Sequence, residues 1–225
     1  ELARRLAQGE VPRSVRGLCY ISHDRPGEGV GLPPFSVAAG DKSAFARMFD
    51  TFYRNNDPIT ARILYQEHSG RFLVQNPPPE TPSGEELDRI HELDYELAVH
   101  PFYKQQGEVR ALETIRFALA THRGCYGECS FCAIAVHQGR TVSWRTRSSI
   151  VREARRMTSH PEFRGIIHDV GGPTANMYGF ECRIKLRRGA CADKRCLYPE
   201  ICPGLKTDHG EQIRLLDELR RIEGV

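Results

Sequence analysis

Three cysteines are spaced as CxxxCxxC in the run His122-Arg-Gly-Cys-Tyr-Gly-Glu-Cys-Ser-Phe-Cys132. Cys125, Cys129 and Cys132 lie too close together for ordinary disulfide bracing, so the spacing indicates three thiolates converging from one loop. Iron–sulfur clusters are held by cysteine thiolates, normally four. Three ligands leave one iron without a protein ligand, and such an iron can bind and activate another molecule. The spacing therefore predicts an incompletely ligated iron–sulfur cluster that serves catalysis.

The same loop resembles the signature of radical S-adenosylmethionine (radical SAM) enzymes, in which an aromatic residue precedes the last cysteine. Phe131 is that aromatic residue. Other parts of the chain resemble the YgiQ-like branch of this superfamily, so the resemblance covers nearly the whole chain. The similar runs are Arg123-Gly-Cys-Tyr-Gly-Glu-Cys-Ser-Phe-Cys-Ala-Ile134, His137-Gln-Gly-Arg140, Asp169-Val-Gly-Gly-Pro-Thr-Ala-Asn-Met-Tyr178, Leu32-Pro-Pro-Phe35, Val74-Gln-Asn-Pro-Pro-Pro79 and His100-Pro-Phe-Tyr103.

The resemblance implies a radical SAM enzyme of unassigned substrate. In such an enzyme the three cysteines hold a [4Fe-4S] cluster, which cleaves S-adenosylmethionine reductively and generates a 5′-deoxyadenosyl radical. It also implies an electron donor such as flavodoxin or ferredoxin. Phe131 is expected near the adenine of the cofactor, and Gly171 and Gly172 near its amino group. Pro173 stands where the family usually has glutamate, and no catalytic side chain is assigned.

The order of predicted elements from about residue 112 is strand, loop, helix, strand, loop, helix. Residues 115–121 read as a strand that leads into the cysteine loop, and residues 165–170 read as a second strand that ends in the glycine pair. Ser148 and Ser149 are expected to cap the helix between them, with Ile150, Val151, Ala154 and Met157 facing inward. This alternation argues for parallel β/α units and an α/β fold.

By resemblance, the fold is part of a radical SAM barrel, a partial TIM-type β/α barrel of six units. Only two units are present, and a two-stranded parallel sheet would leave exposed edges. The chain is therefore expected to be a fragment of a longer protein. Residues 1–110 are expected to form a mixed α+β segment that joins an upstream domain to the barrel. Residues 111–225 are expected to form the N-terminal part of the barrel, with a cysteine-rich insertion at 180–205.

The first half of the chain contains clear local patterns. Phe45, Met48, Phe49 and Phe52 recur at helical spacing behind Asp41, which predicts a helix whose aromatic stripe faces the core. Residues 63–68 and 72–75 flank Ser69-Gly70 and predict a hairpin. Ser83-Gly-Glu-Glu86 is a capping-box pattern that opens a helix, whose apolar face runs through Leu97 and which ends at His100-Pro101.

A second group of cysteines lies in an irregular segment with little core to bury them. Its members are Cys182, Cys191, Cys196 and Cys202. A structural zinc or an auxiliary iron–sulfur cluster would tie this segment together, although free thiols fit equally well. Cys19 stands alone in a strand-like run and is expected to be a buried small hydrophobe.

Composition narrows the class of protein. The chain has 225 residues and a formal net charge of +3, which is too small to indicate a nucleic-acid partner. No apolar run is long enough for a membrane span, and eight cysteines without a secretion signal fit a reducing, cytoplasmic compartment. His122, His137 and His168 flank the predicted site and are expected to serve packing or hydrogen bonding more often than catalysis.

Two alternatives stay open beside the radical SAM enzyme of unassigned substrate. One is a non-catalytic module in which both cysteine groups hold zinc or iron–sulfur clusters. The other is an RNA-modifying radical SAM enzyme, because the six arginines around the helix that follows the cysteine loop could contact phosphates. They are Arg140, Arg145, Arg147, Arg152, Arg155 and Arg156. A solvated helix face paired with acidic residues is the favoured explanation of these arginines.

Overall fold

The computed structural model describes residues 2–172 and 175–225. The chain divides into two compact units, and the chain runs from one to the other more than once. The first unit contains Glu1–Thr81 and Ile184–Lys194, and the second contains Pro82–Arg183 and Arg195–Val225. Both units mix helices and strands, as an α/β sequence pattern predicts. The division at residues 110 and 111 and the six-unit barrel stay predictions.

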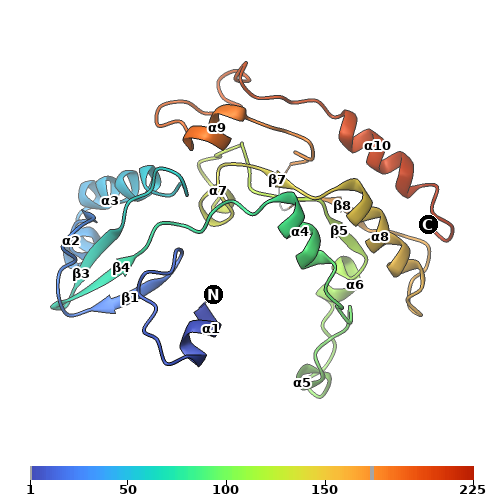
Figure 1. Cartoon of the computed structure of the whole chain (residues 1–225), viewed down its shortest axis with the longest axis horizontal. Coiled ribbons are helices and arrows are strands. Elements are labelled where there is room, and N and C mark those ends of the chain that lie inside the picture. The colour runs from blue at the N-terminus through green and yellow to red at the C-terminus, as the bar shows by residue number, and fades with distance from the viewer. Residues whose placement is uncertain (1, 173–174) are drawn as a thin grey trace. The chain divides into compact units, whose positions relative to one another are not determined.

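The first unit contains a four-stranded sheet in the order β1-β4-β3-β2. Its elements are α1 (Leu2–Ala7), β1 (Cys19–Ser22), β2 (Val30–Gly31), α2 (Phe35–Gly40), α3 (Lys42–Arg54), β3 (Leu64–His68) and β4 (Arg71–Gln75). β3 and β4 pair antiparallel across Ser69 and Gly70, which confirms the predicted hairpin. Both turn residues have positive φ, 52° and 76°. In Figure 1, α2 and α3 lie side by side next to β3.

Helix α3 begins where its cap predicts, but two phenylalanines of its predicted core-facing stripe are exposed. The Asp41 carboxylate accepts a hydrogen bond from Ser43 N at 2.8 Å. Phe45 and Phe49 are 54% and 49% exposed, and Ala44 is the residue of this helix that is fully buried. Met48 and Phe52 of the predicted stripe are half-buried, and Gln66 Nε2 in β3 donates to Met48 Sδ at 3.2 Å. The prediction of a core-facing stripe was therefore wrong for Phe45 and Phe49.

The segment 184–194 belongs to the first unit although it lies far along the chain. Asp57, which is 2% exposed, accepts hydrogen bonds from Ile59 N at 3.0 Å and from Ala190 N at 2.9 Å. Gly189 has φ +80°, and a Cβ atom there would be 2.4 Å from Asp57 Oδ1. Glycine is required at this position because it tolerates both the left-handed backbone and the close carboxylate.

The second unit holds the candidate site. Its elements are α4 (Gly84–His91), α5 (Pro101–Lys104), α6 (Ala111–Ile115), β5 (Ala118–Ala120), β6 (His122–Arg123), α7 (Ile134–His137), β7 (Ser143–Trp144), α8 (Arg147–Thr158), β8 (Asp169–Gly171) and α10 (Gly210–Leu219). α9 (Arg183–Arg188) begins here and continues into the first unit. No helix among the described residues combines the length and apolar character that crossing a bilayer requires.

Strands β5 and β8 pair in parallel, with Ala118 opposite Asp169 and Ala120 opposite Gly171. β6 and β7 form a separate antiparallel pair. α8 and α10 run beside one another in Figure 1, and both contribute to the core behind β5. The buried members of this core are Phe117, Leu119, Ile150, Val151, Ala154, Met157, Tyr178, Leu215, Leu219 and Ile222. The inward residues predicted for α8 are confirmed.

Two helix boundaries in this unit differ from the sequence predictions. The Ser83 cap is confirmed, since its hydroxyl accepts from Glu86 N at 3.1 Å, but α4 ends at His91. Tyr95 turns back and donates its hydroxyl to Ile90 O at 3.0 Å, a local bond that serves the helix end. The cap of α8 is Thr146, whose hydroxyl accepts from Ser149 N at 3.2 Å, and the predicted serine caps were wrong.

Candidate functional site

The cysteine loop and the glycine pair begin at the same edge of a sheet. β5 runs into Thr121 and β6, and β8 ends at Gly171. Thr121 N donates to Gly171 O at 2.7 Å, which joins the carboxyl ends of the two parallel strands. In parallel α/β sheets this edge is where functional loops gather. The strand that ends in the glycine pair, β8, is therefore the direct neighbour of β5, the strand that leads into the cysteine loop.

The backbone of the cysteine loop is held on its N-terminal side by short contacts. Cys125 N donates to Gly139 O at 3.1 Å, and Gly124 N donates to Gln138 Oε1 at 3.3 Å. Gly124 has φ +84°, and a Cβ atom there would be 2.1 Å from Thr141 O. A side chain at this position would overlap a main-chain carbonyl that cannot rotate away. The loop entrance therefore depends on glycine.

Two of the three predicted ligands flank a single glycine. A Cβ atom on Gly127 would be 3.2 Å from Cys125 Sγ and 3.5 Å from Cys129 Sγ, and Gly127 N donates to Cys125 Sγ at 3.2 Å. Cys125 is buried, Cys129 is exposed and Cys132 is half-buried, and all three are free thiols. Backbone N–H groups directed at cysteine sulfur are a feature of iron–sulfur sites.

The donor set therefore fits an iron–sulfur cluster in its chemistry. Three thiols on one loop are the soft ligands that iron–sulfur clusters take. Within the described residues, no three histidine, cysteine or acidic side chains stand together as metal ligands. The contacts place Cys125 and Cys129 beside Gly127, and Cys132 follows one turn later, its N–H donating to Cys129 O at 3.1 Å. Phe131, predicted near adenine, is 91% exposed.

The imidazole of His122 lies directly behind the second residue of the glycine pair. A Cβ atom on Gly172 would overlap the ring. His122 is 2% exposed, and its Nδ1 lies 2.8 Å from Thr121 Oγ1. Its Nε2 has no hydrogen-bond partner among the described residues. Burial lowers the pKa of His122 to about 4, so the ring is neutral at physiological pH.

The remaining residues of the glycine motif are only partly described. Gly171 pairs in β8, and a Cβ atom there would lie 3.5 Å from Asp169 Oδ1. Pro173, which replaces the glutamate of the family motif, lies outside the described residues, as does Thr174. The sequence singled out the glycine pair and His122 separately. Their positions after consecutive predicted strands could have indicated the contact. His122 follows the first of these strands and the glycine pair follows the second.

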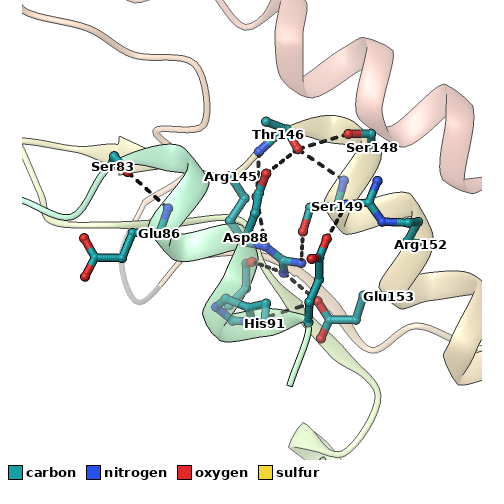
Figure 2. Close-up of polar contacts among 12 residues, drawn as sticks. Ser83, Glu86, Asp88, His91, Arg145, Thr146, Ser148, Ser149, Arg152 and Glu153 are labelled. Carbon is teal, nitrogen blue, oxygen red and sulfur yellow. Dashed lines mark hydrogen bonds and ion pairs between the residues drawn. The ribbon is translucent and has the colours of Figure 1, made fainter. Parts of the chain in front are cut away.

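Arg145 fixes the end of β5 from behind, through a network drawn in Figure 2. Its side chain is 1% exposed. Nη1 donates to Ala120 O at 2.9 Å and to Glu153 Oε2 at 2.5 Å, and Nη2 donates to Ser149 Oγ at 2.9 Å. Its backbone N–H also donates to Thr121 O at 2.9 Å. This arginine therefore joins the strand that carries the cysteine loop to helix α8.

Helix α4 joins the same network (Figure 2). Asp88 accepts from Thr146 N at 3.0 Å and from Thr146 Oγ1 at 2.6 Å, so it bonds the residue that caps α8. His91 Nδ1 lies 3.9 Å from Glu153 Oε2. The pKa of His91 is lowered, first by burial and then by the nearby Arg145 guanidinium. The preceding segment of the chain is thereby attached to the strand that carries the site.

The arginines of this region are engaged by acidic groups. Arg147 Nη1 lies 2.7 Å from Glu218 Oε1, and Arg152 pairs with Glu92. Arg145, Arg147 and Arg152 are therefore already paired with carboxylates. Fewer of the six arginines remain for the phosphate contacts that the sequence allowed. The simpler reading of the basic stretch, arginines paired with acids, is confirmed for these three.

The second cysteine group does not share one unit. Cys182 and Cys196 are buried and Cys202 is half-buried in the second unit, whereas Cys191 belongs to the stretch 184–194 of the first. Tyr126 Oη accepts from Cys182 N at 3.2 Å, and burial raises the pKa of this phenol to about 12. Nothing in the described part of the chain supports a second metal at these cysteines.

Comparisons with known proteins agree on one family. The family described as "Radical SAM N-terminal" matches residues 1–118. A UPF0313 protein of Fusobacterium nucleatum is 50% identical over 225 residues, which are 100% of this chain and 40% of that protein. A UPF0313 protein of Methanosarcina mazei is 47% identical over 198 residues, 88% of this chain and 31% of that protein.

A UPF0313 protein of Clostridium perfringens is 42% identical over 220 residues, which are 96% of this chain and 33% of that protein. The chain thus spans between about a third and two fifths of the length of these relatives. No solved structure matches the chain.

Proposed function

The chain belongs to the radical SAM proteins, in their UPF0313 or YgiQ-like branch, and on this premise we propose that it carries the cluster loop of a radical SAM enzyme. In this proposal Cys125, Cys129 and Cys132 hold a [4Fe-4S] cluster. When bound, the cluster and S-adenosylmethionine supply the chemistry: one electron cleaves a sulfonium carbon–sulfur bond to give methionine and a 5′-deoxyadenosyl radical. The substrate that loses hydrogen to this radical stays unassigned.

One observation carries the proposal more than any other. Cys125 Sγ and Cys129 Sγ flank Gly127 on a loop that follows β5, and the strand paired to β5 ends in Gly171 and Gly172. Three thiols alone would fit a structural zinc or an electron carrier. A glycine pair at the same sheet edge adds backbone groups that carry no side chain of their own, as a second ligand beside the cluster requires.

The chain's own residues have separate tasks in this scheme. Gly124 and Gly127 keep the loop backbone close to the sulfurs, and Gly127 N orients Cys125 Sγ. We assign the amino group of S-adenosylmethionine to the backbone of the glycine pair. Gly171 O already accepts from Thr121 N, which uses one of its two lone pairs. Phe131 is free to turn toward the adenine because it is exposed.

The partners and location form part of the same proposal. An electron donor such as flavodoxin or ferredoxin would reduce the cluster. All eight cysteines are free thiols, which fits a reducing compartment such as the cytoplasm.

Anaerobic reconstitution of the full-length protein with iron and sulfide tests the proposal. We expect a brown protein that forms 5′-deoxyadenosine from S-adenosylmethionine when dithionite is added. Cys125→Ala, Cys129→Ala and Cys132→Ala should each lower iron content and abolish product. Cys19→Ala is the matched control, since Cys19 is an exposed thiol in β1 of the first unit and not the buried small residue that the sequence predicted. Unchanged iron and product in the three loop variants would refute the assignment, as would a colourless protein loaded with zinc.

A further inference from the structure

A hollow in the first unit is lined by positive charge. It has a volume of about 640 Å³ and is lined by residues 13–14, 16, 20, 28–29, 62–63 and 76–77. A volume of this order is typical of small-molecule sites. It is formed wholly within the first unit, so it is separate from the cysteine loop.

Three arginines and one carboxylate line this hollow: Arg13, Arg16, Arg62 and Glu28. Among the described residues, the side chains of Arg13 and Arg62 have no hydrogen bond or ion pair. Arg16 donates from Nε to Pro78 O at 2.9 Å and from Nη2 to Pro58 O at 2.5 Å. These carbonyls hold the guanidinium in place but do not neutralise it. One carboxylate against three cations leaves excess positive charge that an anion would compensate.

The backbone around the hollow is fixed before any ligand binds. Asn76 is 5% exposed, and its Nδ2 donates to both Arg13 O and Val15 O at 2.7 Å. Gly29 has φ +120°, and a Cβ atom there would be 2.7 Å from Ile63 O, next to Arg62. The backbone at Arg13 is therefore held by hydrogen bonds, and the side chains of Arg13 and Arg62 are exposed, so an anion in solution can reach both guanidinium groups. A backbone that is already held lowers the entropic cost of binding.

The chemistry of the lining favours phosphate over other anions. Guanidinium groups match the oxygen geometry of phosphate with paired N–H donors. The guanidinium carbon of Arg13 lies 5.5 Å from the centre of the Tyr20 ring, so a flat aromatic surface stands beside the cations. We propose that this hollow binds the phosphate group of a small molecule, held by Arg13, Arg16 and Arg62. This site is independent of the radical chemistry proposed above.

Isothermal titration of the full-length protein with pyrophosphate in a chloride buffer tests the site. We expect saturable one-to-one binding, and the double substitution Arg13→Gln/Arg62→Gln should weaken it about tenfold or more. Arg47→Gln is the matched control, because Arg47 is an exposed α3 arginine, 3.9 Å from Asp41 and outside the hollow. Folding of each variant is checked by circular dichroism. The two substituted side chains make no described hydrogen bond, so the variants should fold.

A gain-of-binding variant gives an independent check. Glu28→Gln removes the one carboxylate of the lining, so pyrophosphate should bind about threefold more tightly. Acetate at the same concentrations should not compete, because it lacks the phosphate oxygens. Three outcomes would overturn the proposal: no binding of pyrophosphate, equal binding by the double variant, or equal competition by acetate.

Discussion

The imidazole of His122 occupies the space that a side chain at Gly172 would need, since a Cβ atom there would be 2.4 Å from both Cε1 and Nε2. The two residues follow neighbouring parallel strands, β5 and β8. The ring therefore limits how closely Gly172 can approach the sheet. In the proposed function the glycine pair contacts S-adenosylmethionine, so His122 and Gly172 link strand packing to cofactor placement.

Gly172→Ala should destabilise the protein by about 1–3 kcal/mol, because the new methyl group overlaps a buried ring that is held at Nδ1. Urea unfolding measures the change. The double variant His122→Ala/Gly172→Ala should recover part of the loss, since removal of the ring opens the space. Gly27→Ala is the control, because nothing lies within 4 Å of a Cβ atom there. Strictly additive losses in the double variant would contradict the contact.

Gly124→Ala should prevent loading of the cysteine loop. Its new Cβ atom would be 2.1 Å from Thr141 O, so the loop entrance must move. We expect iron incorporation after reconstitution to fall at least about fivefold, together with a loss of stability of about 2–4 kcal/mol. Gly139→Ala separates steric overlap from backbone strain. Gly139 also has positive φ, +102°, but nothing lies near its Cβ position. Equal iron loss in both variants would assign the effect to backbone strain.

Glu153→Gln should destabilise the protein by about 1–3 kcal/mol, because it removes the nearer of the two carboxylates at the buried Arg145 guanidinium and leaves Asp88, which is 4.0 Å from Nε. The matched control is Glu92→Gln, which breaks the exposed pair with Arg152 and should cost no more than about 1 kcal/mol. Thermal or urea unfolding compares the two. A similar small loss in both variants would show that Arg145 does not depend on this carboxylate.

Stability should fall as pH drops from about 6.5 toward 4, because His122 stays neutral in the folded chain. Its folded pKa is about 4, below the usual value of 6.5, so the unfolded chain binds the extra proton in this window. At pH 5 the loss attributable to His122 is about 2 kcal/mol. His122→Gln should flatten the slope, as measured by urea unfolding at several pH values. An unchanged slope in His122→Gln would contradict the neutral buried ring.

Local patterns in the sequence predicted local structure well. The hairpin at Ser69-Gly70 and the caps at Asp41 and Ser83 follow from residues that bond their own neighbours. The parallel pairing of β5 with β8 followed from the alternation of strands and helices. The hairpin and the two caps need no knowledge of distant partners, so the sequence was sufficient for them.

Features that depend on distant partners were not predicted. Thr146 was missed as the cap of α8, and the acid that bonds it, Asp88, lies 58 residues earlier in the chain. The Phe45 and Phe49 stripe has helical spacing, but spacing cannot show which side of a helix meets the sheet. The candidate site shows the same division. The cysteine spacing could be recognised directly, whereas the buried Arg145 that holds the end of β5 looked like another surface arginine.

The return of residues 184–194 to the first unit has a topological consequence. The polypeptide crosses between the units after Thr81, after Arg183 and after Lys194. A single protease cut after Arg183 or after Lys194 would leave residues 1–81 of the first unit covalently joined to the second unit, whereas a cut after Thr81 would leave only residues 184–194 of the first unit joined to it. Neither unit is a contiguous piece of sequence that could be expressed by itself. Within the first unit, the contacts of Asp57 with Gly189 and Ala190 join an early part of the polypeptide to a late one.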